Sequence, residues 1–324
     1  MKVADMHSDT IGMLLQMRRE GQEIGLRKNC IHMDLEKMKQ AEYLAQNFAL
    51  FVDLKDYPNP YEEAKAQYAL FAEELAKNTD MISQVFSYEE LVKNQQEGKM
   101  SAFLTLEDGE VCLGSIEKLE EFYSYGARMM TMVWNYDNSL SSSNASRKLP
   151  FPRRYSGNRP GLTETGIEFV ERMEELGMIP DVSHMSDEGI KDLLQVAKKP
   201  FVASHSNARA LCAHSRNLTD EFLRQMGEKG CLIGANYYSY FLKEGAEFSK
   251  TEWIADHILY MVNLAGIESV GLGSDFDGID CELELSDCSK MHALAELLRK
   301  KGMAENQIEQ IFYKNVMRLY KEVL

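Results

Sequence analysis

The sequence has no C-x-x-C pair, no long apolar run and no excess of basic residues, and each absence excludes a class of protein. Six scattered cysteines argue against a zinc ribbon, a redox motif and a disulfide framework, and favour reduced, mostly buried thiols. Because no stretch could span a bilayer and the first residues, MKVADMHSDT, lack the apolar core of a secretory signal, we expect a cytoplasmic location without membrane contact. A net charge of −15 argues against nucleic-acid binding and favours a small-molecule partner.

A proline- or glycine-rich linker and a repeat of fixed period are also missing, so we expect one domain over residues 1–324. Short apolar or β-branched runs alternate with segments of helical spacing, such as residues 60–77 and 165–176, which is typical of βαβ units. The number of expected strands is that of a (β/α)8 TIM barrel, the α/β fold that we predict. These strands are residues 2–8, 47–53, 101–107, 127–134, 178–184, 200–205, 231–236 and 269–275.

A polar stretch from Asn135 to Thr163 follows the fourth expected strand and is longer than an ordinary barrel loop. Because it starts where barrels place their active sites, we expect it to cover the mouth of the barrel and shape a substrate pocket. A solvated surface loop is the alternative interpretation. The stretch carries basic residues in an otherwise acidic chain, namely Arg147, Lys148, Arg153, Arg154 and Arg159.

The expected strands end in residue types that bind metals, at the end of the barrel that carries active sites. His7 and Asp9 lie two residues apart and would face the same side of the first strand. Glu107 ends the third expected strand, and His184 and His205 end the fifth and sixth. Imidazole and carboxylate ligands suit zinc, although cobalt or manganese would fit similar ligands.

These ligands exceed what one catalytic ion needs, so we predict two zinc ions. His7 and Asp9 would hold one ion. His184 and His205 would hold the other. Glu107 and a water would bridge the ions, and the water, ionised to hydroxide, would attack the substrate.

Each residue alone has an ordinary interpretation, since a histidine at a strand end is commonly a hydrogen-bonded core residue. Several together at one end of successive strands are hard to explain without a metal, because burying them unpaired is costly. Asp275 ends the eighth expected strand, and we expect it to transfer protons, since its D-F-D-G segment lacks the rest of a calcium-binding EF-hand loop. The other histidines are expected to be structural or solvated, namely His32, His214, His257 and His292.

Motifs along nearly the whole chain, from residue 4 to Arg318, resemble the membrane (renal) dipeptidase family. Their ordered combination is far more specific than any one motif. They are DMHSD at residues 5–9, GLT at 161–163, GMIPDVSH at 177–184, SHSNARALC at 204–212, RN at 216–217 and GLGSDFDG at 271–278.

The resemblance implies a dinuclear zinc barrel of the amidohydrolase superfamily that cleaves dipeptides, often with a D-residue at the C-terminal position. It implies the same metal ligands as the strand ends. Arg216 would hold the free carboxylate of the substrate, for which a planar guanidinium is well shaped. Asp275 would take the proton from the bridging water and pass it to the leaving amine. Tyr238 would line the substrate site.

One departure from the family pattern lies at the end of the fourth expected strand. The mammalian enzymes carry a histidine there, which is thought to polarise the scissile carbonyl, whereas this chain reads Trp134-Asn135. An indole offers a single N–H donor, so Trp134 or Asn135 has taken over part of the role, the metal acts alone, or the substrate differs. An amidase, deacylase or lactonase on the same barrel, or a non-catalytic metal-binding relative, remains the alternative. The sequence does not fix an oligomeric state, and a homodimer is one candidate.

Overall fold

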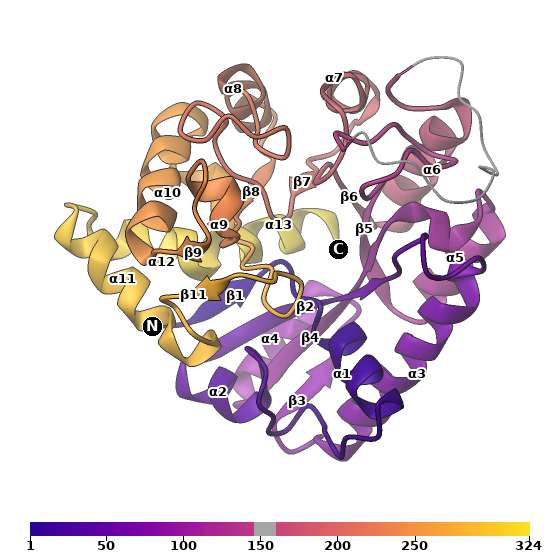
Figure 1. Cartoon of the computed structure of the whole chain (residues 1–324), viewed down its shortest axis with the longest axis horizontal. Coiled ribbons are helices and arrows are strands. Elements are labelled where there is room, and N and C mark those ends of the chain that lie inside the picture. The colour runs from indigo at the N-terminus through magenta and orange to yellow at the C-terminus, as the bar shows by residue number, and fades with distance from the viewer. Residues whose placement is uncertain (146–159) are drawn as a thin grey trace.

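The computed structural model describes residues 1–145 and 160–324, and its centre is a closed barrel of parallel strands (Figure 1). The barrel closes because β1 pairs with both β2 and β10, while β2 pairs with β4. This arrangement confirms the predicted (β/α)8 TIM barrel. The barrel strands are β1 (Val3–Asp5), β2 (Tyr43–Phe51), β4 (Met100–Glu107), β5 (Ala127–Thr131), β6 (Ile179–Asp181), β7 (Val202–Ala203), β8 (Leu232–Ala235) and β10 (Val270–Leu272).

Helices surround the strands, as Figure 1 shows with α3 and α5 on one side and α10 and α11 on the other. Ser186 and Thr219 cap α7 and α8 by accepting a backbone N–H in the first turn, which fixes where the preceding loops become helix. The helices are α1 (Thr10–Arg19), α2 (Leu35–Gln40), α3 (Pro60–Lys77), α4 (Tyr88–Gln96), α5 (Ile116–Ser124), α6 (Glu164–Leu176), α7 (Asp187–Val196), α8 (Asp220–Glu228), α9 (Ser239–Leu242), α10 (Thr251–Ala265), α11 (Met291–Lys300), α12 (Glu305–Glu309) and α13 (Asn315–Val323).

The C-terminal helix α13 packs against the apolar side chains inside the barrel. Tyr320 of α13 is buried with its ring centroid 4.3 Å from that of Phe103 on β4. Its hydroxyl donates a hydrogen bond of 2.6 Å to Asn47 Oδ1 on β2. These contacts fill the end of the barrel where the strands begin. The polar side chains gather at the opposite end.

Each expected strand overlaps a barrel strand, but β2 and β4 start earlier than expected, the other barrel strands are shorter than expected, and one more strand joins the sheet. The extra strand, β3 (Ile82–Gln84), pairs with the start of β4, and β5 pairs with the later part of β4. Two short strands, β9 (Phe248–Ser249) and β11 (Glu282–Leu283), form a separate parallel pair. Between α12 and α13, residues Gln310–Lys314 form a π-helical segment.

The long polar stretch after β5 is described in part. Ser141 bridges Leu162, and Ser143 bridges Met185 beside β6, so both ends of the stretch pack together. The basic residues of this stretch, and part of the segment predicted to cover the barrel mouth, lie within 146–159, outside the described residues. No helix in the described part of the chain is long and apolar enough to cross a membrane. Four of the six cysteines are buried, as predicted.

Candidate active site

Acidic and imidazole side chains meet at the end of the barrel where the strands end, and all of them are buried. The structure brings together the five expected metal ligands and the expected proton carrier. Glu107 is the last residue of β4, His7 and Asp9 follow β1, His184 follows β6, His205 follows β7, and Asp275 follows β10.

Glu107 lies between two groups of side chains and turns one carboxylate oxygen to each. Its Oε2 lies 3.4 Å from His7 Nε2, which is also 3.4 Å from Asp9 Oδ2. Its Oε1 lies 3.2 Å from His184 Nε2 and 3.6 Å from His205 Nε2. Tetrahedral zinc with bonds of about 2.0–2.1 Å separates neighbouring ligand atoms by roughly 3.3 Å. The imidazole nitrogens therefore lie near the spacing of a metal site from the Glu107 carboxylate. In two trios, His7 with Glu107 and His205 and His7 with Asp9 and Asp275, the donor atoms all lie within 4.8 Å of one another.

Several nitrogen and oxygen atoms that could bind a metal face one another in this site. His7 Nε2 and Asp9 Oδ1 are buried without a hydrogen bond to any described residue. His184 Nε2 and His205 Nε2 are 3.0 Å apart. His184 Nδ1 faces the acceptor Asn135 Oδ1 at 2.9 Å, so Nδ1 carries the proton and Nε2 presents its lone pair to the centre. Lone pairs this close repel unless a cation lies between them, so the donor set fits divalent metal ions.

The crowded groups also shift the pKa values of one another. Burial, reinforced by the charge of Asp9, raises the pKa of Glu107 to about 8. Burial raises the pKa of Asp275 to about 7. Burial opposes protonation of His7, but Glu107 and Asp9 outweigh it and hold the pKa of His7 well above its ordinary value. Burial holds the pKa of His205 well below its ordinary value. The site thus has an excess of buried negative charge that divalent cations would compensate.

The prediction that His7 and Asp9 face the same side of the first strand is wrong, because β1 ends at Asp5 and neither residue is in a strand. Asp5 Oδ1 accepts the His7 backbone N–H at 3.2 Å and the Ser274 backbone N–H at 3.0 Å. These bonds turn the chain out of β1 and tie it to the loop after β10. The two side chains converge through this turn.

The backbone is strained at two of these positions. His184 has φ 71° and Asp275 has φ 63°, in the left-handed region that favours glycine. Such conformations cost about 1–3 kcal/mol each and persist where surrounding contacts impose them, commonly at functional sites. In these conformations His184 Nε2 lies 3.2 Å from Glu107 Oε1, and Asp275 Oδ1 lies 3.8 Å from His7 Nε2.

Residues that sequence reasoning missed hold the site side chains in place. Asn236 Nδ2 donates to Asp275 Oδ2 at 2.8 Å. Ser204 Oγ lies 2.8 Å from His205 Nδ1 and donates to Asp181 Oδ2 at 2.5 Å. Asp181 is fully buried at the end of β6. The sequence signal is weak, since each of these residues only ends or follows a short strand.

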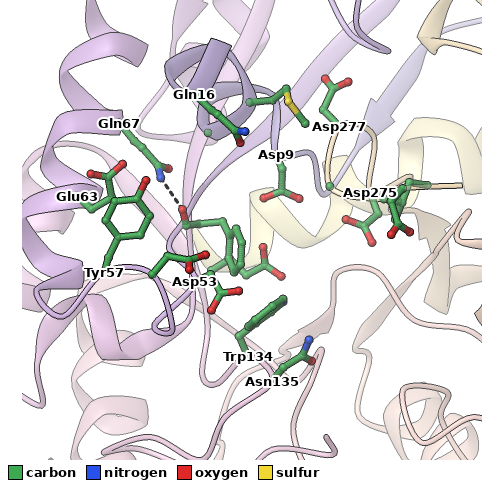
Figure 2. Close-up of a pocket in the computed structure, with 18 of the residues that line it drawn as sticks. Asp9, Gln16, Asp53, Tyr57, Glu63, Gln67, Trp134, Asn135, Asp275 and Asp277 are labelled. Carbon is green, nitrogen blue, oxygen red and sulfur yellow. Dashed lines mark hydrogen bonds between the residues drawn. The ribbon is translucent and has the colours of Figure 1, made fainter. Parts of the chain in front are cut away.

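The ligand group opens into a cavity of about 810 Å³, a size suited to a small substrate. Figure 2 shows Asp9 and Asp275 on one side of it and Asp53, Tyr57 and Glu63 on the other. Most charged side chains along this cavity are carboxylates. The cavity therefore favours a substrate with a cationic end.

The substrate residues expected after the fourth barrel strand and near β8 line this cavity. The ring centroid of Trp134 lies 5.9 Å from that of His184 and 4.7 Å from that of Phe51, so the indole forms a wall beside the ligands. Asn135 lines the cavity and also holds His184. Tyr238 lines it with its hydroxyl bonded to Asp280 Oδ1 at 2.8 Å.

Arg216 does not line the cavity, but it packs against Phe241, which does. It is 5% exposed, its Nη2 donates to the His205 carbonyl at 3.1 Å, and its guanidinium lies over the ring of Phe241 at 5.1 Å. Its Nε has no hydrogen-bond partner in the described part of the chain, and burial lowers its pKa to about 10. A buried guanidinium with a spare donor is suited to bind an anion.

Two further predictions concern residues that do not bind metal. His257 accepts the Ala208 backbone N–H on Nδ1 at 3.1 Å and bonds the Leu242 carbonyl through Nε2 at 3.0 Å, which confirms a structural role. Asp277 accepts the Thr10 hydroxyl and the His32 backbone N–H, both at 2.7 Å. The D-F-D-G segment therefore braces neighbouring loops.

Comparisons with solved structures find metallopeptidases of the same fold. The crystal structure of dipeptidase AC, a metallopeptidase of family M19, is 25% identical with a TM-score of 0.89, over 100% of this chain and 98% of that chain. A Rhodobacter sphaeroides metallopeptidase, liganded with a phosphinate mimic of the dipeptide L-Ala-D-Ala, is 25% identical with a TM-score of 0.86, over 100% of this chain and 99% of that chain.

Sequence comparisons point to the same group. An uncharacterized dipeptidase of Schizosaccharomyces pombe is 31% identical, over 99% of this chain and 80% of that protein. The family model for membrane dipeptidase, peptidase family M19, matches residues 1–324. The chain therefore belongs to the membrane dipeptidase family and is a metal-dependent dipeptidase of the amidohydrolase superfamily.

Proposed function

We propose that this protein is a dinuclear zinc dipeptidase. The proposal rests on the position of the Glu107 carboxylate between two groups of side chains. Its Oε2 faces His7 Nε2 at 3.4 Å, and its Oε1 faces His184 Nε2 at 3.2 Å. A carboxylate shared in this way is what two adjacent ions require, and one ion would leave the second group of donors unpaired. His7, Asp9 and Glu107 would hold one ion, and Glu107, His184 and His205 the other.

Bound zinc would supply an activated water and polarise the scissile carbonyl. The chain itself provides the proton carrier, for which we propose Asp275. Asn236 holds its Oδ2, while its Oδ1 lies 3.8 Å from His7 Nε2, facing the ligand group. One oxygen is thus fixed and the other is available to take a proton from the attacking water and deliver it to the leaving amine.

The substrate we propose is a dipeptide with both ends free, including one with a C-terminal D-residue. The carboxylate-rich cavity suits the protonated amino end. Arg216 supplies a buried cation for the carboxylate end, reached past Phe241. The Rhodobacter sphaeroides neighbour, which holds a mimic of L-Ala-D-Ala, supports this substrate class. Trp134 would restrict the space beside His184.

Metal analysis combined with a substrate panel tests the proposal. The panel contains L-Ala-L-Ala, L-Ala-D-Ala, N-acetylalanine and a lactone. We expect two equivalents of zinc per chain and turnover of both dipeptides. Active protein with one equivalent would contradict the dinuclear centre. Turnover confined to N-acetylalanine or the lactone would identify a deacylase or lactonase.

A further inference from the structure

Ser204 connects a metal-ligand candidate to a fully buried carboxylate. Its Oγ lies 2.8 Å from His205 Nδ1 and donates to Asp181 Oδ2 at 2.5 Å. Ser204, His205 and Asp181 each have 0% exposure. The three side chains therefore form a buried chain of hydrogen bonds from Asp181 to His205.

The donors and acceptors in this chain leave one arrangement. Asp181 Oδ1 already accepts the backbone N–H groups of Ser183 and Ser204, at 2.9 and 2.8 Å, and its Oδ2 accepts the Thr131 hydroxyl at 2.6 Å. A serine hydroxyl has one proton, and here it is given to Asp181. Towards His205 Nδ1 the Ser204 oxygen must accept, so Nδ1 carries the ring proton and Nε2 keeps its lone pair.

We infer that Ser204, held by Asp181, is a positioning residue that fixes His205 in the tautomer able to bind metal. The inference rests on the proposed metal centre and adds to it. Partners of this kind orient the imidazole and raise the basicity of its free nitrogen, and their loss typically lowers metal affinity by about 10–100-fold. Asn135 holds His184 from the opposite side of the ligand group by a direct bond to Nδ1.

A purely structural role for Asp181 is the competing explanation, since Asp181 also ties β5 to β6 through Thr131. Thr131 offers a matched control. Its hydroxyl donates to the same oxygen, Asp181 Oδ2, and not to His205. Removing either hydroxyl deletes one hydrogen bond to one buried carboxylate. Only removal of the Ser204 hydroxyl would also remove the hydrogen bond to His205 Nδ1.

The experiment compares Ser204→Ala with Thr131→Ala in the full chain. Zinc affinity is measured by competition with a chelator, and folding of the metal-free form by thermal unfolding. We expect Ser204→Ala to lower the affinity for one of two zinc ions by about 10–100-fold. Both variants should lower the unfolding temperature of the metal-free protein by a similar amount, because each loses one hydrogen bond to Asp181. Thr131→Ala should leave zinc affinity unchanged. Equal zinc affinity in the wild type and Ser204→Ala would overturn the inference.

The tautomer can also be measured without a variant of Ser204. In ¹⁵N-histidine-labelled wild-type protein without metal, NMR should show His205 with a protonated Nδ1, the signal being assigned from its loss in His205→Gln. A protonated Nε2 would overturn the inference even if Ser204→Ala fails to fold. A wild type that binds no second zinc ion would instead contradict the proposed function.

Discussion

Metal-free protein should lose stability as the pH rises from 6.5 to 8. In the folded chain the pKa of buried Glu107 is raised from its ordinary 4.5 to about 8. Over this interval the folded state holds a proton that the unfolded state has lost, so the free energy of unfolding falls as the pH increases. The raised pKa of His7 acts in the same direction above its ordinary value of 6.5.

The size of this effect follows from the proton difference. One proton changes the free energy of unfolding by about 1.4 kcal/mol per pH unit, so Glu107 alone accounts for a loss of about 2 kcal/mol over the interval. His205, with a lowered pKa, is neutral in both states at the upper end of the interval and offsets little of it. Asp275, with a pKa of about 7, adds to the loss near the lower end.

Urea unfolding in the presence of a chelator, followed by circular dichroism at several pH values from 6.5 to 8, measures the effect. Glu107→Gln is the matched control, because a neutral amide does not titrate. The substitution also removes the charge that most raises the pKa of His7. The stability of this variant should fall less steeply with pH than that of the wild type, and the part that remains comes from Asp275 and Asp108, whose pKa values burial raises to about 7. Zinc-loaded wild type should lose the dependence, since cations replace the protons. Metal-free wild type whose stability stays constant or rises over this range would refute the reasoning.

Three further predictions concern single residues. His184→Ala or His205→Ala should remove one of two zinc ions together with activity, as measured by elemental analysis and dipeptide turnover; full zinc content would contradict the ligand assignment. Arg216→Ala should raise KM for dipeptides more than for their C-terminal amides, and equal losses for both would exclude a carboxylate role. Asp275→Asn should lower kcat by about 10²–10⁴-fold with little change in KM, and a kcat near that of the wild type would exclude proton transfer.

The fold and the ligand set could be predicted because a barrel forces the ends of its strands together. Glu107 does end β4, and the histidines follow β6 and β7 as expected. The periodic helices were equally clear, since α3 has the expected bounds, Pro60–Lys77. The short strand β3 escaped prediction because its three residues, ISQ, carry no pattern of their own and are held by pairing with β4.

The supporting residues could not be predicted, because their roles arise from contacts distant in sequence. Asp181 meets Thr131 and Ser204 across neighbouring strands, and no local pattern marks such a contact. Asn135 was expected to contact substrate, and the structure shows that it also bonds His184. Arg216 was expected at the substrate, yet it lies behind Phe241, a position that depends on how the loops after β7 and β8 pack.

X-ray anomalous scattering at the zinc edge, from crystals of the zinc-loaded protein, tests the central claim most directly. The account predicts two peaks about 3.5–4 Å apart, one on each side of the Glu107 carboxylate. One peak should contact His7 and Asp9, and the other His184 and His205. A single peak, or two peaks of which neither contacts Glu107, would contradict a dinuclear centre bridged by this residue.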